Sequence, residues 1–388
     1  MPIKNRLAEM QPEVAAWRQD IHAHPELLYD THRTAAFVEE KLKAFGCDEV
    51  VTGIGQTGVV AVIKGKADTS GKVIGLRADM DALPIFEATG VEYASKTPGL
   101  MHACGHDGHT AMLLGAAKYL AETRNFDGQV AVIFQPAEEG GAGGKAMVDD
   151  GMMERWNIQE VYGMHNAPGI PVGTFAIRPG PFFASADQFE LHVEGKGGHA
   201  ARPHDAIDTT LVASHMVVAL QSIASRNVDP LKQVVVTVGT FRTESEAHNV
   251  IPQHVLLKGT IRTLDPEVRE LAAERLKMIV ENTAAAFGAT VRIEYDKGYP
   301  VMVNHALETE HARAAAEKVA GQPALEVPPL MGGEDFAFML EARPGAMILT
   351  GNGDTAMVHH PEYNFDDEAI PVGASFWAEM VESRMPVA

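Results

Sequence analysis

The sequence predicts an α/β protein in which one domain is interrupted by a second, smaller one. Three observations support this fold class. In the first half of the chain, short apolar runs alternate with helical patterns, which is typical of a sheet carrying helices on its faces. From about Ala186 the strands alternate apolar and polar residues, as strands with one exposed face do. From roughly Pro300 the first pattern resumes. We therefore expect a first part at 1–185, an insertion at 186–299 and a second part at 300–388.

The first part contains four candidate strands and one long helix. The apolar runs VAVIF and VIGL suit central strands that are buried on both faces. A helix is expected at His109–Glu122, with Asp107 as its N-cap. The expected strands are Val59–Ile63, Val73–Arg77, Gln129–Phe134 and Val161–Met164.

The insertion has the order βαββαβ of a ferredoxin-like α+β domain. Its strands are expected at FELHVEG, QVVVTVGTF, HVLLKGTIRT and VRIEYDKGY, with a first helix near 206–225. The second helix should span Asp265–Phe287, because Asp265 suits an N-cap, Pro266 the first turn and Gly288 the end. After the insertion, a helix at Leu307–Ala320, the strand AMILTGNG and a closing helix complete the interrupted domain.

Composition excludes several classes of partner. The chain has 388 residues, 46% of them hydrophobic and 22% charged, and a net charge of −20. Such a negative surface repels phosphate backbones and anionic lipids, so neither nucleic acid nor membrane is expected as a partner. The opening segment lacks the apolar core of a signal peptide, and the two cysteines, Cys47 and Cys104, provide no disulfide framework. A cytoplasmic protein is expected.

Two short motifs have alternative interpretations. Gly53–Gly58 matches G-x-G-x-x-G, but a strand rather than a helix follows it, so a connecting loop is favoured over a dinucleotide site. His22 and His24 resemble the paired histidines of barrel-type amidohydrolases. Because a helix precedes them, a structural turn is favoured, and a place near the active-site cleft stays open.

Metal-binding side chains are concentrated in a few places. Three histidines, Cys104 and Asp107 lie within eight residues, and Cys104 and His106 are spaced to point the same way in extended chain. Both suit divalent metals such as zinc, manganese or nickel, although a polar loop with a buried thiol is the alternative. Other candidates follow four strands, whose carboxyl ends meet at one edge of a parallel sheet. These candidates are Asp79, Asp81, Glu138, Glu139, His165 and His359. We therefore predict a metal site.

The adjacent Glu138 and Glu139 suggest hydrolytic chemistry. One carboxylate can bind a metal while the other takes a proton from a metal-activated water. This arrangement fits hydrolysis better than redox chemistry.

Ten segments of the sequence resemble the aminoacylase/carboxypeptidase family of metallohydrolases, and within it the hippurate hydrolase and indoleacetyl-amino-acid hydrolase branch. The similarity runs in order from about residue 18 to 370. The matching segments are RQDIHAHPE, RADMDALPI, MHACGHDGHTAMLLGAA, FQPAEEGGAGGKAMVDDG, GMHN, GKGGHAARPH, HNVIP, GTIRT, GGEDFAFM and HHPEYNFDD.

The resemblance implies two divalent metal ions, with Mn, Zn and Ni all open, and Glu138 as the general base. Asp81 would support the metal site, and the family's His-x-Pro pattern selects His359 rather than His360. The implied ligands are Cys104, His106, Glu139, His165 and His359. Unlike most relatives, this chain has Asp79 where a histidine is usual and offers the thiol of Cys104, which leaves the metal's identity open.

The resemblance also implies that the insertion is a lid and dimerisation domain. His199 would reach the active site of a neighbouring subunit and stabilise the oxyanion, and Asn249 and Arg262 would bind the substrate's carboxylate. A homodimer or homotetramer is expected. The predicted function is hydrolysis of N-acyl amino acids to a carboxylic acid and a free amino acid. A dipeptidase or carboxypeptidase using the same site is the alternative, and a non-catalytic binding protein is the more distant one.

Overall fold

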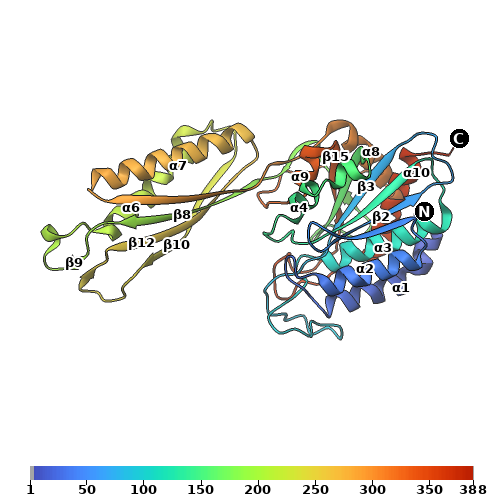
Figure 1. Cartoon of the computed structure of the whole chain (residues 1–388), viewed down its shortest axis with the longest axis horizontal. Helices are drawn as coiled ribbons and strands as arrows, with labels where there is room; N and C mark the ends of the chain where they lie inside the picture. The colour runs from blue at the N-terminus through green and yellow to red at the C-terminus, as the bar shows by residue number, and fades with distance from the viewer. Residues whose placement is uncertain (1–3, 388) are drawn as a thin grey trace. The chain divides into compact units, whose positions relative to one another are not determined.

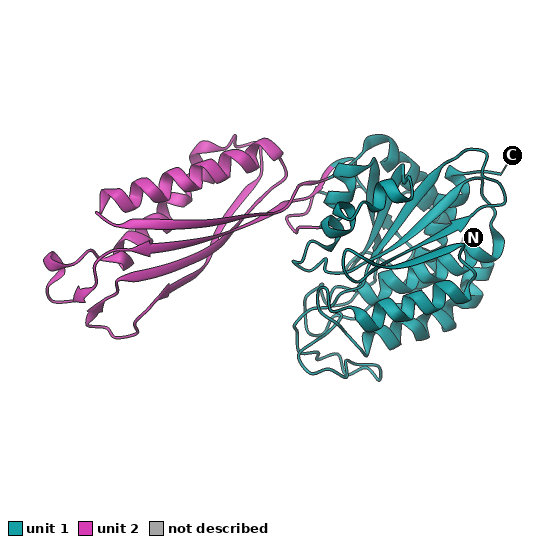
Figure 2. Cartoon of the chain, viewed as in Figure 1, with its two compact units in different colours: residues 1–180, 303–328, 335–388 teal, residues 181–302, 329–334 magenta. Residues whose placement is uncertain are grey.

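The computed structural model describes residues 4–387, which form two compact units (Figures 1 and 2). Unit 1 comprises Met1–Gly180, Val303–Pro328 and Asp335–Ala388, and unit 2 comprises Pro181–Met302 and Pro329–Glu334. The chain passes between them at β7 (Gly180–Phe183), at β14 (Met302–Asn304), and again after Pro328 and after Glu334. Within the described residues, no helix is long and apolar enough to cross a membrane.

Unit 1 is built on a seven-stranded mixed sheet of order β1-β2-β4-β3-β5-β15-β6. The four neighbours β4, β3, β5 and β15 run parallel. β2 is antiparallel to β4, β6 is antiparallel to β15, and β1 is antiparallel to β2. The strands are β1 (Glu49–Ile54), β2 (Gly58–Lys64), β3 (Val73–Asp79), β4 (Gln129–Gln135), β5 (Glu160–Ala167), β6 (Phe175–Ala176) and β15 (Gly345–Gly351). All seven residues of β3 and of β15 are buried, as the apolar runs predict for central strands.

Helices cover both faces of this sheet. Ile74, Leu76 and Ala78 of β3 belong to the apolar core that the larger helices form. Alternate residues point the other way, where Arg77 lies against Phe336 at the start of α9. The helices are α1 (Asn5–His22), α2 (His32–Ala44), α3 (His106–Thr123), α4 (Gly143–Asp149), α5 (Met152–Arg155), α8 (Ala306–Ala320), α9 (Ala337–Ala342) and α10 (Ile370–Arg384).

Unit 2 has a four-stranded antiparallel sheet with two main helices on one face. Its order, β10-β12-β8-β13, is that of a ferredoxin-like βαββαβ fold. The elements are β8 (Ser185–Glu194), α6 (Thr209–Leu220), β10 (Val234–Thr243), β12 (His254–Thr263), α7 (Pro266–Ala286) and β13 (Thr290–Tyr299), with a short ladder of β9 (Gly198–His199) and β11 (Val250–Ile251) at one end (Figure 1). Asp265 caps α7 as predicted, because its carboxylate accepts from the amides of Glu267 and Val268.

Two local expectations are settled by the backbone. Gly53–Gly58 connects the antiparallel β1 and β2, so the segment is a turn between strands, as expected. The expected start of α3 is wrong. The helix begins at His106, its N-cap is Gly105, and Asp107 lies inside the first turn. The Asp107 carboxylate does not cap the helix, because it is held 2.8 Å from Nδ1 of His22.

Candidate metal centre

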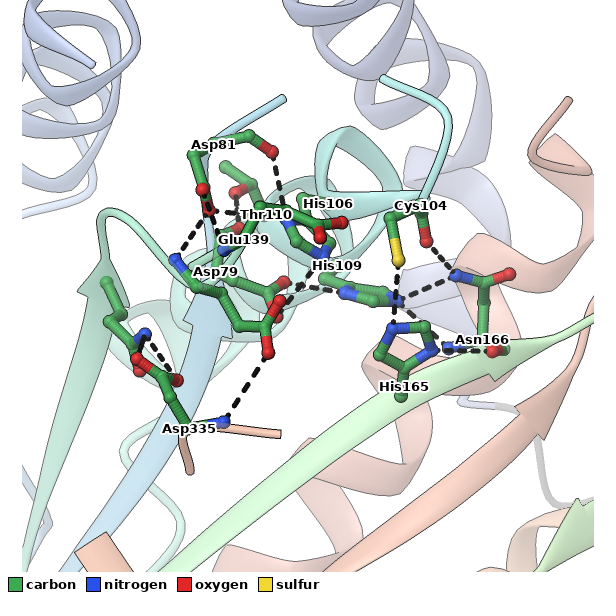
Figure 3. Close-up of polar contacts among 12 residues, drawn as sticks. Asp79, Asp81, Cys104, His106, His109, Thr110, Glu139, His165, Asn166 and Asp335 are labelled. Atoms are coloured by element: carbon green, nitrogen blue, oxygen red, sulfur yellow. Dashed lines mark hydrogen bonds and ion pairs between the residues drawn. The ribbon is translucent and has the colours of Figure 1, made fainter. Parts of the chain in front are cut away.

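Four parallel strands bring their carboxyl ends to one edge of the sheet in unit 1. Asp79 is the last residue of β3, and Asp81 follows two residues later. Glu138 and Glu139 follow β4, and His165 lies in the last half of β5. The segment after β15 returns to the same edge, because the His359 amide donates to the carbonyl of Ala103 at 2.7 Å. The polar side chains predicted from separate strand ends are therefore gathered, and Figure 3 shows those of Asp79, Asp81, Glu139 and His165.

His106 presents a nitrogen that lacks a protein partner. Its Nδ1 donates to the backbone carbonyl of Asp81 at 2.8 Å, so Nε2 carries the lone pair. Nε2 is buried and has no hydrogen-bond partner among the described residues, although Asp79 Oδ2 lies 3.6 Å away. Burial disfavours a charged ring, but the carboxylates of Asp79 and Asp81 outweigh it and raise the pKa of His106 to about 10. The site thus has a nitrogen that requires a cation or a proton.

Cys104 and His165 face each other beside His106. Cys104 Sγ lies 3.4 Å from His165 Nε2, and His165 Nδ1 donates to the carbonyl of Asn166 at 2.7 Å. Nε2 of His165 is therefore also the lone-pair nitrogen. Burial, followed by the charges of Glu139 and Glu138, holds the pKa of the Cys104 thiol well above its usual value. A thiolate there needs a bound cation.

Asp81 holds the backbone of the two glutamates. Its Oδ1 accepts from the Glu138 amide and its Oδ2 from the Glu139 amide, both at 3.0 Å. Glu138 itself is 7% exposed, and its Oε1 accepts from the amide of Asp335 at 3.4 Å. These contacts fix both glutamates while their carboxyl groups face the site.

Glu139 is paired with the last predicted ligand, His359. Glu139 Oε1 lies 3.2 Å from His359 Nε2. Burial disfavours the Glu139 carboxylate, but His359 and His106 outweigh it and lower the pKa of Glu139. His359 adopts a left-handed backbone with φ +68°, which is uncommon for a residue with a side chain and is often found at functional sites.

His109 lies close to the site but its nitrogens are already used. Nδ1 is 2.7 Å from Asp79 Oδ1, and Nε2 accepts from the backbone amide of Asn166 at 2.9 Å. Burial lowers the pKa of His109 to about 4, so the ring is neutral and donates from Nδ1 to Asp79. The lone pairs of His106 and His165 accept from no backbone or side-chain N–H group among the described residues, whereas the lone pair of His109 accepts from the Asn166 amide. This difference distinguishes the two proposed metal ligands from a histidine that only supports the site.

The donor atoms are close enough to share cations. Sets of three donors lie within 4.8 Å of one another in this part of unit 1. Among them are Cys104, His106 and His165; Asp79, His106 and His109; Cys104, Glu139 and His359; and His106, Glu138 and Glu139. Mixed sulfur, nitrogen and oxygen donors suit borderline divalent metals. With the unpartnered Nε2 of His106, the residues present fit a metal centre.

The predicted residues of unit 2 lie in two separate places. His199 in β9 pairs with Val250, and Ala200 donates to the carbonyl of Asn249, so His199 and Asn249 are neighbours. Nδ1 of His199 accepts from the amide of Ala201 at 3.1 Å, which leaves the proton on the exposed Nε2. Arg262 lies near the far end of β12, roughly 25 Å from its first residue at about 3.3 Å per residue. One unit 2 therefore does not bring Arg262 to His199.

Residues 75–383 match the sequence profile of Peptidase family M20/M25/M40. The chain belongs to this family. Membership makes it a metal-dependent amidohydrolase, because the family's hydrolytic chemistry and the donor set at the sheet edge agree.

Relatives within Peptidase family M20/M25/M40 match nearly the whole chain. The N-acetyl-L-cysteine deacetylase of Bacillus subtilis is 42% identical over 372 residues, which cover 96% of this chain and 88% of the relative. The hippurate hydrolase of Campylobacter jejuni is 42% identical over 376 residues, or 96% and 97% of the two chains. A Bacillus subtilis structure described as a dinuclear metal binding peptidase of the M20 family has a TM-score of 0.84 and 33% identity, covering 97% of this chain and 99% of the other.

Several residues that shape this M20 site were not predicted from the sequence. Arg77 donates to Asp79 at 2.7 Å and to Asp335 at 3.0 Å, and Gln135 also donates to Asp335. Asn166 contacts His109 and the carbonyl of Cys104. Asn166 and Asp335 stand in the segments GMHN and GGEDFAFM, which signalled the family but gave no role to these two side chains.

Proposed function

We propose that this enzyme hydrolyses N-acyl amino acids, such as hippurate-type substrates, to a carboxylic acid and a free amino acid. The observation that carries the proposal is the pairing of a buried carboxylate, Glu138, with an adjacent set of metal-binding donors. Relatives named as a deacetylase and a hippurate hydrolase, both at 42% identity, support amide substrates of this kind.

The proposed ligands of two divalent ions are Cys104, His106, Glu139, His165 and His359. The unpartnered Nε2 of His106 and the sulfur–nitrogen contact of Cys104 and His165 support this assignment. Ions bound there would lower the pKa of water toward neutrality and polarise an amide carbonyl. Mn, Zn and Ni all suit such a mixed donor set.

Glu138 is the proposed general base and acid. It removes a proton from the attacking water as the water oxygen bonds to the amide carbon. The same carboxyl group then gives that proton to the leaving nitrogen as the C–N bond breaks. Asp81 supports this role by position, because it fixes the Glu138 and Glu139 amides.

Unit 2 is proposed to act as a lid and dimerisation domain. Arg262 can bind the substrate's carboxylate with its planar guanidinium, and Asn249 can contribute a further hydrogen bond. The exposed Nε2–H of His199 suits donation to an oxyanion. Because Arg262 and His199 lie far apart in one unit 2, we assign them to active sites of different subunits.

The surface of unit 2 supports a dimer built through this domain. β10 pairs only with β12 among the described strands, so one edge of the sheet is open. Beside the sheet, α6 exposes Leu211 and Val218, and β10 exposes Val235 and Phe241. An open strand edge flanked by apolar side chains is suited to association with a second copy.

The function is tested with Glu138→Gln on a substrate panel. The variant should keep its metal and lose about 10²- to 10⁴-fold in kcat, because only the proton-transfer group changes. Wild-type enzyme should cleave hippurate-type substrates faster than dipeptides with a free amine. Near-wild-type turnover by the metal-loaded variant would exclude this mechanism, and faster dipeptide cleavage would favour the dipeptidase or carboxypeptidase alternative.

The shared active site is tested by mixing inactive variants. Glu138→Gln and His199→Ala homodimers should each be nearly inactive. Reassociated together, they should regain about a quarter of wild-type activity, since half of the dimers are mixed and one of their two sites is intact. No recovery in verified mixed dimers would place His199 in its own subunit's site.

A further inference from the structure

Asn166 is a buried residue whose polar groups are all engaged around the metal centre. It follows His165 in β5 and is 2% exposed. Its backbone carbonyl accepts from His165 Nδ1, and its backbone amide donates to His109 Nε2. Its Nδ2 donates to the Cys104 carbonyl at 2.6 Å. The residue therefore touches both sides of the Cys104–His165 pair.

Tyr363 fixes the direction of the Asn166 amide. The Tyr363 hydroxyl donates to Asn166 Oδ1 at 2.8 Å, which obliges Nδ2 to face Cys104 and His109. Burial holds the pKa of Tyr363 well above its usual value, so the hydroxyl keeps its proton. Without that donor, the amide could turn and present its oxygen to the Cys104 carbonyl, where two acceptors would repel.

The chain between Cys104 and His106 lies tightly against this pair. Gly105 has φ +89°, and a Cβ there would come within 2.3 Å of both Asn166 Nδ2 and the Tyr363 hydroxyl. The close approach leaves room only for glycine. Asn166 and Tyr363 thus form the surface on which the Cys104–Gly105–His106 segment rests.

Tyr363 also ties in the segment that carries His359. The Tyr363 amide donates to the His360 carbonyl at 2.9 Å, and the His359 amide donates to Ala103 at 2.7 Å. Three chain segments with proposed ligands, at Cys104, His165 and His359, are therefore joined through Asn166 and Tyr363.

We propose that Tyr363, acting through Asn166, is a positioning residue that sets the spacing of Cys104 and His165 for metal binding. The proposal rests on the proposed function, because it assigns Cys104 and His165 as ligands. Tyr363 contacts the ligands only through Asn166 and Gly105 and is not itself a proposed metal ligand. Residues that orient metal ligands from behind commonly change metal affinity about 10- to 100-fold when altered.

The test is a titration of metal-free full-length protein with cobalt(II). Calorimetry measures the binding, and the thiolate-to-cobalt absorption band reports on the bond to Cys104. Tyr363→Phe removes one hydroxyl and leaves the ring. We expect its thiolate absorption to require about 10- to 100-fold more cobalt, and kcat to fall while KM stays near wild type. Tyr93→Phe is the matched control, because the Tyr93 hydroxyl donates to Asn364, one residue beyond Tyr363, at 3.3 Å.

A second variant separates positioning from loss of folding. Asn166→Asp keeps the side chain's size and the acceptor for Tyr363 but replaces the donor to Cys104. It should weaken cobalt binding at least as much, and Tyr363→Phe added to it should cause little further loss. Thermal unfolding of the metal-free proteins verifies that each variant folds.

The inference is overturned if Tyr363→Phe binds cobalt with wild-type affinity and absorption, or if Tyr93→Phe weakens it equally. Failure of the proposed function has a different result. In that case, the wild-type protein itself would bind no cobalt through its thiolate.

Discussion

The two units both bury charge, but they balance it differently. In unit 2, Asp187 is fully buried and its carboxylate accepts from Arg269 Nε at 3.0 Å and from the Tyr295 hydroxyl at 2.8 Å. In unit 1, Asp79, Asp81, Glu138 and Glu139 gather at one sheet edge. Asp79 is paired with the permanently charged guanidinium of Arg77. Glu139 instead faces a histidine, His359, whose ring carries a positive charge only when it is protonated.

The same contrast separates two groups of metal-type donors. Glu190, His192 and Glu294 of unit 2 also lie within 4.8 Å of one another. There Lys258 pairs with Glu190, and Arg292 pairs with Glu294, on a solvent-facing strand surface. Protein cations already balance those carboxylates. Nε2 of His192 also lacks a hydrogen-bond partner among the described residues, so an unpartnered ring nitrogen does not by itself mark a metal centre. The difference teaches that a buried carboxylate facing histidines, as Glu139 does, is the better mark.

Replacing one histidine in each unit with alanine gives the strongest test of the difference between the two donor clusters. His165→Ala removes a proposed ligand, so activity should fall by more than roughly 100-fold, the upper figure for residues that only support a ligand. His192→Ala removes the histidine of the balanced cluster and should leave kcat and metal content unchanged. Metal analysis and steady-state kinetics measure both. Equal losses in the two variants would refute the distinction between the clusters.

Removing the guanidinium that pairs with the buried Asp187 carboxylate should destabilise unit 2 alone. Arg269→Met leaves the Asp187 carboxylate buried without its guanidinium, which should lower the free energy of unfolding of unit 2 by about 3–5 kcal/mol. The loss should be the same with and without added metal. Urea unfolding followed by hydrogen exchange measures it by region. A metal-dependent loss would mean that this pair is linked to the metal centre.

The buried carboxylate of Glu160, in unit 1 but away from the proposed metal ligands, gives a smaller, pH-dependent effect. Glu160 contacts Arg384 at 2.7 Å, Lys72 at 2.6 Å and Tyr162 at 2.9 Å. Burial opposes its charge, but these partners outweigh it and lower the pKa of Glu160 to about 2. A lowered pKa in the folded state stabilises the protein above the unfolded-state pKa of about 4.3, and this stability is lost as pH falls toward 2.

Glu160→Gln should therefore lower the free energy of unfolding of unit 1 by about 1–2 kcal/mol at pH 7, after allowance for solvent screening. The difference from wild type should shrink between pH 4 and pH 3. Chemical denaturation at a series of pH values measures it. A difference that grows in acid would contradict the assigned charge state.

The sequence predicted the central strands and the gathering of donor side chains at one sheet edge, because both depend on local pattern. Apolar runs located β3, β4 and β5, and the parallel-edge rule brought Asp79, Glu139 and His165 together. Side-chain contacts between residues far apart in the sequence could not be predicted from local pattern. The expected N-cap role of Asp107 failed because His22, 85 residues away, competes for the carboxylate. Asn166 and Tyr363, 197 residues apart, carried no local signal of their contact.

The most direct test of the account adds metal to metal-free protein and measures uptake and hydrogen exchange across the whole chain. We expect about two ions per chain, as the proposed ligand set implies for a dinuclear centre. Protection should appear in peptides around Asp79, Cys104, Glu138 and His165 and not around His192. Protection at His192, or none at the sheet edge of unit 1, would contradict the claim that unbalanced buried donors define the metal centre.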